Sequence, residues 1–265
     1  MHETPPFWVK LPKRGRFLME YVRILGLPFP VCARREMILS AHRLIAARRG
    51  ARILTPNAEM VARAARDADF FAVLRRADLL IPDGVGISLA AARQGVSLPR
   101  LPGIEFAEAL LRTTPRPLRV FFLGARPGVA RDAAQELSRR YPRVEIAGVQ
   151  DGYFPRERDR TVAAAIAGVQ PDLVFVCLGS PRQEEWIDAH ALPCPAIGLG
   201  GAFDVWSGRV KRAPAAARQM GMEWLWRTVR EPSRFSRLPS LASFAWQTVT
   251  EKRPAFSVNC EKNKP

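Results

Sequence analysis

The sequence predicts an α/β fold in which a parallel sheet has helices on both faces and is followed by a helical, basic and aromatic C-terminal appendage. Short apolar runs alternate with helical patterns of about 10 to 15 residues, which is typical of βαβ units. The apolar runs are continuous, as expected for parallel strands that helices cover on both sides. A change in composition after about residue 208 separates the appendage from the sheet domain.

The expected elements follow one another from residue 52 onward. The strands should cover residues 52–55, 78–81, 118–124, 144–149, 172–179 and 195–201. The helices should cover residues 58–67, 85–94, 103–113, 129–141, 158–169 and 180–190. Ligands of open parallel sheets bind at the carboxyl ends of the strands, so the residues after each strand are the candidate site.

Four segments are expected along the chain. Residues 1–20 form a loose basic lead-in, and residues 21–205 form the sheet domain. Residues 206–250 form the appendage, and residues 251–265 form a flexible tail.

The charge balance predicts an anionic partner. Lys and Arg number 41 against 25 Asp and Glu, which gives a formal net charge of +16. Nucleic acid, acidic lipid or a phosphorylated substrate would each suit this excess. Arginine dominates the basic residues, and its planar fork suits phosphate.

Cysteine usage and hydropathy predict a cytoplasmic protein without a membrane span. The four cysteines form no CxxC pair and no zinc-site spacing, which favours a reducing compartment. The first residues carry charges where a signal peptide needs an apolar stretch. No segment offers about 18 uninterrupted apolar residues.

Polar side chains follow the first two strands at the same sheet edge. Asp83 comes after the strand at 78–81, and Thr55 and Asn57 follow the strand at 52–55. A carboxylate, a hydroxyl and an amide together could bind a sugar. Each also has a structural interpretation, because Asp-Gly is a common turn pair and Asn is a good helix cap.

Glycine turns after two later strands predict phosphate contacts. Gly124 and Gly179 each end a strand and precede a helix, whose free N–H groups suit an anion. Gln183 lies in the first turn of the second of these helices. Ordinary tight turns are the alternative, because the glycine spacing is not the dinucleotide-binding fingerprint.

The appendage combines arginine with tryptophan. Eight Lys or Arg and only two acids lie between Arg209 and Arg237, beside Trp206, Trp224 and Trp226. In a helix, one face would carry Met222, Leu225, Trp226 and Val229. This pattern is typical of a helix that lies on a membrane surface. A solvated helix face and a nucleic-acid-binding helix are the alternatives.

Several motifs in order resemble those of the WecG/TagA/CpsF family of bacterial glycosyltransferases, over roughly residues 21 to 239. They include "TPNAEM", "IPDGVG", "LPRLPGIEF", "VFFLGARPG", "VCLGSPRQEEWI", "GLGGAFDVWSGRVKRAP" and "MGMEWLWRTVREPSRFSRLP". The resemblance implies a Rossmann-like fold and inverting transfer of a sugar from a UDP-sugar to a polyprenyl-diphosphate-linked saccharide. The best-known members use UDP-N-acetylmannosamine or its uronic acid, and others build capsule or exopolysaccharide with other sugars such as glucose.

The resemblance also implies partners and a location. No metal or other cofactor and no nucleic acid are expected. A polyprenyl carrier stays in the bilayer, so the protein should be peripheral on the inner face of the plasma membrane and contact its anionic surface. A homo-oligomer is compatible with the resemblance.

The resemblance implies roles for individual residues. Asp83 matches the proposed general base, and a single base suffices for inversion. The matching pocket residues are Thr55, Asn57, Arg100 and Gln183. The appendage arginines that would meet the leaving diphosphate are Arg212, Arg227, Arg230, Arg234 and Arg237. The chain departs from the family pattern at Glu105, where an Asp is usual.

Two other classes of protein remain as alternatives. A non-catalytic nucleotide- or RNA-binding Rossmann-like protein would also explain the positive charge, and it predicts salt-dependent nucleic-acid binding. An NAD-linked oxidoreductase is disfavoured because the dinucleotide fingerprint is missing.

Overall fold

The computed structural model describes residues 20–230, 235 and 238–251. The candidate residues Arg234 and Arg237 lie outside the described residues, as do the side chains of Arg227 and Arg230. The lead-in before Glu20 and the tail after Glu251 also lie outside them.

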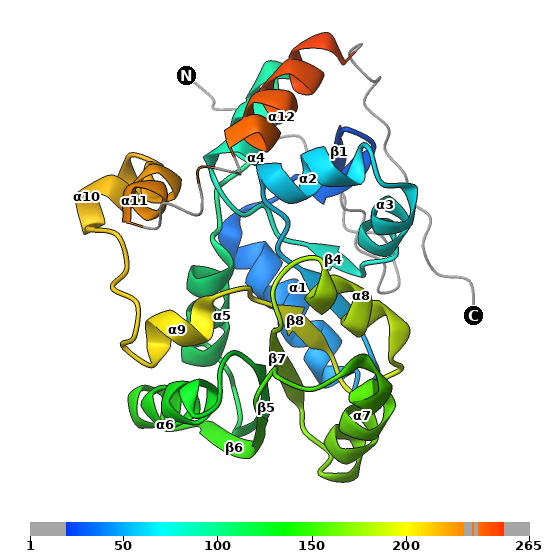
Figure 1. Cartoon of the computed structure of the whole chain (residues 1–265), viewed down its shortest axis with the longest axis vertical. Helices are drawn as coiled ribbons and strands as arrows, with labels where there is room; N and C mark the ends of the chain where they lie inside the picture. The colour runs from blue at the N-terminus through cyan, green and yellow to red at the C-terminus, as the bar shows by residue number, and fades with distance from the viewer. Residues whose placement is uncertain (1–19, 231–234, 236–237, 252–265) are drawn as a thin grey trace, which may run out of the picture.

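A six-stranded sheet forms the centre of the molecule, in the order β4-β3-β8-β7-β5-β6, and all of its neighbouring strands pair in parallel (Figure 1). The strands are β3 (Arg52–Leu54), β4 (Leu79–Leu80), β5 (Leu118–Gly124), β6 (Val144–Gln150), β7 (Leu173–Cys177) and β8 (Ala196–Gly198). This confirms the predicted parallel sheet, and each strand lies within or beside its predicted range. The central strand β7 is buried along its whole length, which explains its continuous apolar sequence.

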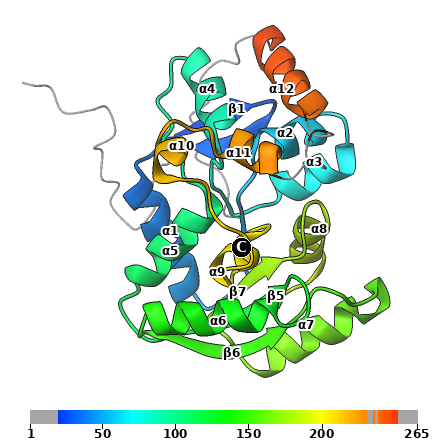
Figure 2. The same cartoon turned by 60° about the vertical axis from the view of Figure 1, so that its left-hand side comes forward.

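Helices flank the sheet on both faces, as Figures 1 and 2 show. One group comprises α1 (Arg34–Ala46), α5 (Gly103–Arg112), α6 (Val129–Arg140) and α9 (Ala202–Trp206), with α1 against α5 and α6 against α9. The other comprises α3 (Ala68–Arg75), α7 (Asp159–Gly168) and α8 (Arg182–Ala189), with α3 against α8. A short 3-10 turn, Arg156–Arg158, precedes α7.

The N-terminal part contains elements that the sequence analysis does not assign. Strands β1 (Tyr21–Ile24) and β2 (Leu27–Pro30) form an antiparallel hairpin before α1. Leu25 and Gly26 both have positive φ, 47° and 81°, as a two-residue hairpin turn requires. A leucine at the first of these positions is unusual, so the turn lacks the common Asn-Gly signal.

The predicted helix at residues 58–67 is too long. Helix α2 (Ala58–Ala64) ends earlier, and α3 starts a separate helix after Asp67. The Asp67 side chain accepts a hydrogen bond from the Phe70 N–H at 3.0 Å, so it caps α3 rather than ending α2.

Trp206 belongs to the core rather than to an exposed aromatic surface. It is 2% exposed and packs on Phe175 and Phe203, with ring centroids 5.8 and 6.1 Å apart. Its Nε1 donates to Glu108 at 2.8 Å, which satisfies the indole N–H. The chain therefore leaves the core only after α9.

The appendage contains α10 (Ala215–Gln219), α11 (Glu223–Arg230) and α12 (Leu238–Thr250). Helix α12 packs along α2 and beside α4 (Val85–Arg93), at the top of the molecule in Figure 1. Phe244 is the buried anchor of α12, and it lies close to Gly86 of α4.

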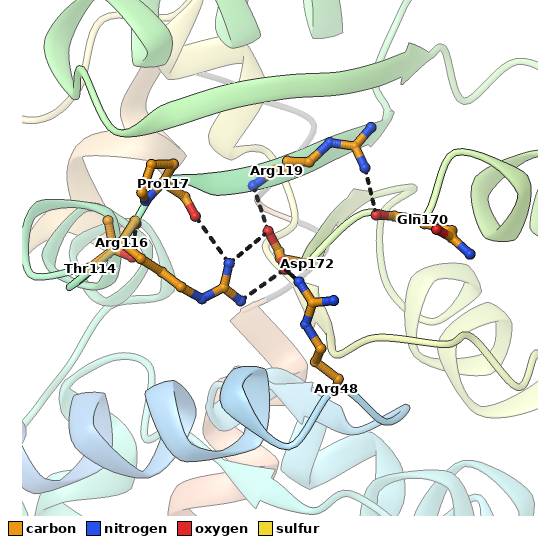
Figure 3. A network of polar contacts seen from close by, with 7 residues as sticks. All are labelled: Arg48, Thr114, Arg116, Pro117, Arg119, Gln170 and Asp172. Carbon is orange, nitrogen blue, oxygen red and sulfur yellow. Dashed lines mark hydrogen bonds and ion pairs between the residues drawn. The ribbon is translucent and has the colours of Figure 1, made fainter.

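An ionic network ties the strand ends opposite the candidate site (Figure 3). Asp172, just before β7, is buried and accepts from Arg116 at 2.9 Å, Arg48 at 3.1 Å and the backbone N–H of Arg119 at 3.0 Å. Burial opposes ionisation of Asp172, yet the Arg116 and Arg119 hydrogen bonds hold its pKa below the ordinary value. The network joins α1, β5 and β7 at the amino ends of the strands.

Candidate active site

Asp83 lies just beyond β4, in the turn that leads into α4. Its carboxylate is partly buried, and its Oδ2 accepts a hydrogen bond from the Gly103 N–H at 3.3 Å. Its own N–H donates to the Pro56 carbonyl at 3.2 Å, which ties the ends of β4 and β3 together. Gly84 follows with a φ of 86°, a conformation that favours glycine. The turn interpretation is therefore confirmed, and the same turn directs a carboxylate toward the start of α5.

Thr55 is buried beside this turn. It is 6% exposed, and its Oγ1 donates to the Gly198 carbonyl of β8 at 2.8 Å. A Cβ on Gly103 would lie only 3.0 Å from the same Oγ1, so Thr55 and the start of α5 are in close contact. Thr55 thus connects β8 with the helix that binds Asp83.

Asn57 caps α2. Its Oδ1 accepts from the Met60 N–H at 3.0 Å, in agreement with the structural interpretation of this residue. Within the described part of the chain its amide nitrogen makes no hydrogen bond, so that donor is available to a ligand.

Gln183 is a buried residue rather than a surface one. It is 3% exposed, its Oε1 accepts from the Gly200 N–H at 2.9 Å, and its Nε2 donates to Glu184 at 2.5 Å. A Cβ on Gly198 would meet that Nε2 at 3.1 Å. The side chain therefore holds the turn after β8.

Glu184, the neighbour of Gln183 in α8, is a buried acid that the sequence analysis quoted within a motif and did not single out. It is fully buried, and burial raises its pKa from the ordinary 4.5 to about 7. Its Oε2 has no hydrogen-bond partner among the described residues. In "PRQEEW" two acids follow Gln183, and such a pair is typical of a solvent-exposed helix surface. Glu184, the first of them, is buried only because α8 packs on the sheet.

Gly124 is the last residue of β5, and Gly179 follows β7. Gly124 has a φ of 127°, and a Cβ there would lie 2.3 Å from the Cys177 carbonyl, so the position requires glycine. Gly179 has a φ of 78° and open space where a Cβ would project. Gly124 is explained by strand packing, whereas Gly179 leaves room at the carboxyl edge.

Ion pairs hold the first part of the appendage on α5. Arg212 contacts Glu105 at 2.7 Å and Glu223 at 3.4 Å, and Arg218 lies 3.9 Å from Glu105. Arg100 donates to the Arg218 carbonyl at 2.5 Å. Glu105, the departure from the family pattern, is thus the centre of the contact between α5 and the appendage.

A pocket of about 500 Å³ opens between these elements, near the turn that carries Asp83. Its charged lining is Arg34 at the start of α1, Arg100, Glu105 and Arg218, and Val85 and Met220 supply apolar walls. Arg34 and Arg218 were not predicted as site residues. No local signal marks them, because each is one arginine among many.

Three of the predicted site residues lie together: Asp83, Thr55 and Gln183 are connected through Gly103 and Gly198. A fourth, Arg100, lines the neighbouring pocket. Arg212 is engaged in ion pairs with the core. The part of the chain that the structure describes holds no cluster of three His, Cys, Asp or Glu side chains suited to a metal ion.

Comparison with known proteins decides the family. The sequence model of the family "Glycosyl transferase WecG/TagA/CpsF" matches residues 22–257. The chain belongs to this family. A WecG/TagA/CpsF member is a glycosyltransferase, which selects an enzyme over the nucleotide- or RNA-binding alternative.

Relatives of this WecG/TagA/CpsF protein carry a specific name. A Bacillus subtilis (strain 168) protein is 38% identical over 210 residues, which cover 77% of this chain and 81% of the relative. A Staphylococcus aureus (strain MW2) protein is 32% identical over 239 residues, which cover 88% and 93%. Both are named N-acetylglucosaminyldiphosphoundecaprenol N-acetyl-beta-D-mannosaminyltransferase.

Proposed function

We propose that this glycosyltransferase moves a sugar of the N-acetylmannosamine type, or a glucose or uronic acid relative, from a UDP-sugar to a polyprenyl-diphosphate-linked saccharide. The reaction inverts the anomeric centre and serves cell-surface polysaccharide synthesis. The names of the Bacillus and Staphylococcus relatives support the acceptor class and the N-acetylmannosaminyl group.

The observation that carries the proposal is the position of Asp83. Its carboxylate lies at the carboxyl edge of the parallel sheet, two residues before Val85, which lines the arginine-rich pocket. A carboxylate that a backbone N–H holds beside an arginine-lined pocket is placed to take a proton close to a diphosphate in that pocket.

In the proposed reaction Asp83 takes the proton of the acceptor hydroxyl. The acceptor oxygen attacks the anomeric carbon as the bond from that carbon to the UDP oxygen breaks. UDP leaves with the electron pair, and negative charge grows on its diphosphate. Arginine side chains and helix N-termini would stabilise this charge.

We further propose that the reaction needs no metal ion. In metal-dependent transferases a divalent cation neutralises the leaving diphosphate. Here the excess of arginine around the pocket can serve the same purpose, since Arg100 and Arg218 line it together with a single carboxylate.

Membrane association follows from the proposed acceptor. Among the helices in the described ranges, none is long and apolar enough to cross a membrane. Large apolar side chains are nevertheless exposed on the appendage, including Val229 on α11 at 67% and Trp246 on α12 at 70%. We propose that these helices contact the inner face of the plasma membrane, where a polyprenyl carrier would be reached.

The full chain, incubated with a panel of UDP-sugars and a polyprenyl-diphosphate saccharide, tests the proposal. We expect one glycosylated lipid product with inverted configuration by mass spectrometry and NMR, and the same yield with EDTA. Asp83→Asn serves as the inactive control. Hydrolysis of the donor without transfer, or no product with any UDP-sugar, would contradict the proposed function.

A further inference from the structure

We propose that Arg34, Arg100 and Arg218 form a binding site for the diphosphate group of a substrate. This inference rests on the proposed function, because both the UDP-sugar and the polyprenyl-linked acceptor contain a diphosphate diester. The three arginines come from the start of α1, the segment before α5, and α10.

The arginines of this pocket are only weakly paired with carboxylates: Arg218 lies 3.9 Å from Glu105, a carboxylate that already contacts Arg212 at 2.7 Å. Within the described ranges, Arg34 makes no ion pair, and Arg100 bonds only to the Arg218 carbonyl. The Nε of Arg218 is buried and has no partner in the same part of the chain. Glu36, the nearest acid along α1, accepts from the Ala33 N–H at 2.9 Å instead.

The carboxylates nearest the pocket already form ion pairs. Glu105 contacts Arg212 at 2.7 Å, and Glu223 contacts the same guanidinium at 3.4 Å. The local group therefore holds four arginines (Arg34, Arg100, Arg212 and Arg218) against two glutamates and the nearby Asp83, so it keeps an excess of positive charge. A diphosphate diester carries two negative charges near neutral pH, so this excess attracts it.

The shape of the pocket suits a phosphate ester. The volume of about 500 Å³ lies in the range of small-molecule sites. Val85 and Met220 give it apolar walls, against which the remainder of a substrate can pack. The pocket also joins the turn of Asp83, so a diphosphate held there belongs to a molecule in reach of the proposed base.

The core and the appendage build this pocket together. Gly221, between α10 and α11, has a φ of 74°, and a Cβ there would lie 3.1 Å from the Val85 Cβ. This close approach brings Arg218 over the start of α4. A diphosphate bound between Arg34 and Arg218 would therefore also hold the appendage on the core.

The test compares Arg34→Gln and Arg218→Gln with the wild-type full chain. We expect the KM for one diphosphate substrate to rise about tenfold or more, because each variant loses a charge-assisted contact. The kcat should change much less if the diphosphate belongs to the acceptor, and it should fall as well if the diphosphate belongs to the leaving UDP. Arg35→Gln is the matched control, because Arg35 is the exposed neighbour on α1 and does not line the pocket.

The substrate whose KM rises is the source of the diphosphate. A rise in the KM for the polyprenyl-linked acceptor assigns the pocket to the acceptor, and a rise in the KM for the UDP-sugar assigns it to the donor. Unchanged KM values for both substrates in both variants would overturn the proposal, while sugar transfer itself and the proposed function would stand.

Calorimetric titration with inorganic pyrophosphate tests the pocket without turnover. Wild type and Arg35→Gln should bind it, and Arg34→Gln should bind it at least about tenfold more weakly. If the wild-type chain transfers no sugar, equal binding by wild type and Arg34→Gln would still refute the pocket. Arg34 is exposed, so its substitution leaves the core intact, and matching thermal midpoints would verify this.

Discussion

Asp83 lies in the turn before α4 and is also the general base that we propose. The positive φ of Gly84 forms the turn, and the Gly103 N–H holds the carboxylate oxygen. The local sequence predicts the turn, because Asp-Gly is a frequent turn pair. Only the approach of α5 from a distant part of the chain sets the direction of the carboxylate.

Asp83→Asn should abolish sugar transfer while the fold persists. The amide oxygen can still accept from Gly103, but an amide cannot take the acceptor proton, so a loss of about 100- to 10,000-fold in kcat is expected. Turnover with the UDP-sugar and lipid acceptor measures the loss, and an unchanged thermal midpoint serves as the control. Turnover within a few-fold of wild type would rule out Asp83 as the base.

Glu184 shows a different consequence of burial. Its neighbour Gln183 hydrogen-bonds to Gly200 and to Glu184 itself, and both polar side chains are buried. Since burial raises the pKa of Glu184 to about 7, the folded protein keeps this proton where an unfolded chain would have lost it. Stability is therefore expected to depend on pH in a defined window.

The contribution of Glu184 to stability should be complete below about pH 4.5 and be lost as the pH rises to about 7. Over that range the folded state binds more protons than the unfolded state, so the free energy of unfolding falls, by about 3 kcal/mol in total. Glu184→Gln cannot ionise and should remove this decline. Thermal unfolding of both proteins at pH 5 and pH 8 measures it, and equal pH dependence would contradict the assignment.

At the scale of elements, the contact between the appendage and α5 is ionic, whereas the contact of α12 is apolar. Arg212 and Glu105 are 16% and 25% exposed at their side chains, so water screens the pair only in part. Phe244 instead anchors α12 by burial next to α4. The two ends of the appendage are thus held by different forces.

The Arg212–Glu105 pair should show a measurable coupling energy. In a double-mutant cycle with Arg212→Ala and Glu105→Ala, we expect about 1 kcal/mol in the free energy of unfolding. The matched control is Arg209–Asp132, whose side chains are 53% and 45% exposed and which should couple by less than about 0.5 kcal/mol. Equal coupling in the two cycles would show that the partial burial of Arg212 has no energetic effect.

At the scale of the whole molecule, charge and exposed apolar surface act together. The net charge is +16, and α11 and α12 expose Val229 and Trp246. Anionic lipid attracts the positive charge, and the boundary between lipid headgroups and acyl chains accommodates the exposed apolar side chains. The combination supports a peripheral membrane contact through the appendage.

Val229→Glu with Trp246→Glu should weaken binding to anionic phosphatidylglycerol vesicles by about tenfold or more, because both apolar contacts are replaced by like charge. Raising the salt concentration should weaken the wild-type binding as well. Vesicle sedimentation measures both effects. Tyr153→Glu, at an exposed residue of the sheet domain (72%), is the control, and equal loss in this variant would place the contact elsewhere.

The sequence alone determined the parallel sheet, its strands and the edge at which Asp83, Thr55 and Gln183 lie. These follow from hydrophobic periodicity and from Gly, Pro and Asp at strand ends, which are local properties of the chain. The hairpin before α1 escaped prediction because its turn has a leucine at positive φ. Helix α3 escaped it because the pattern of α2 continues past its end.

Only the tertiary structure decided which polar groups are buried or hydrogen-bonded within the protein and which remain available to a ligand. It buried Gln183 and Glu184, used Asn57 as a cap, and brought Arg34 and Arg218 to one pocket. Burial and hydrogen-bond partners depend on segments that are far apart in the chain, and no local pattern encodes such contacts. The pocket arginines are ordinary in sequence and become distinctive only where α1 and the appendage meet.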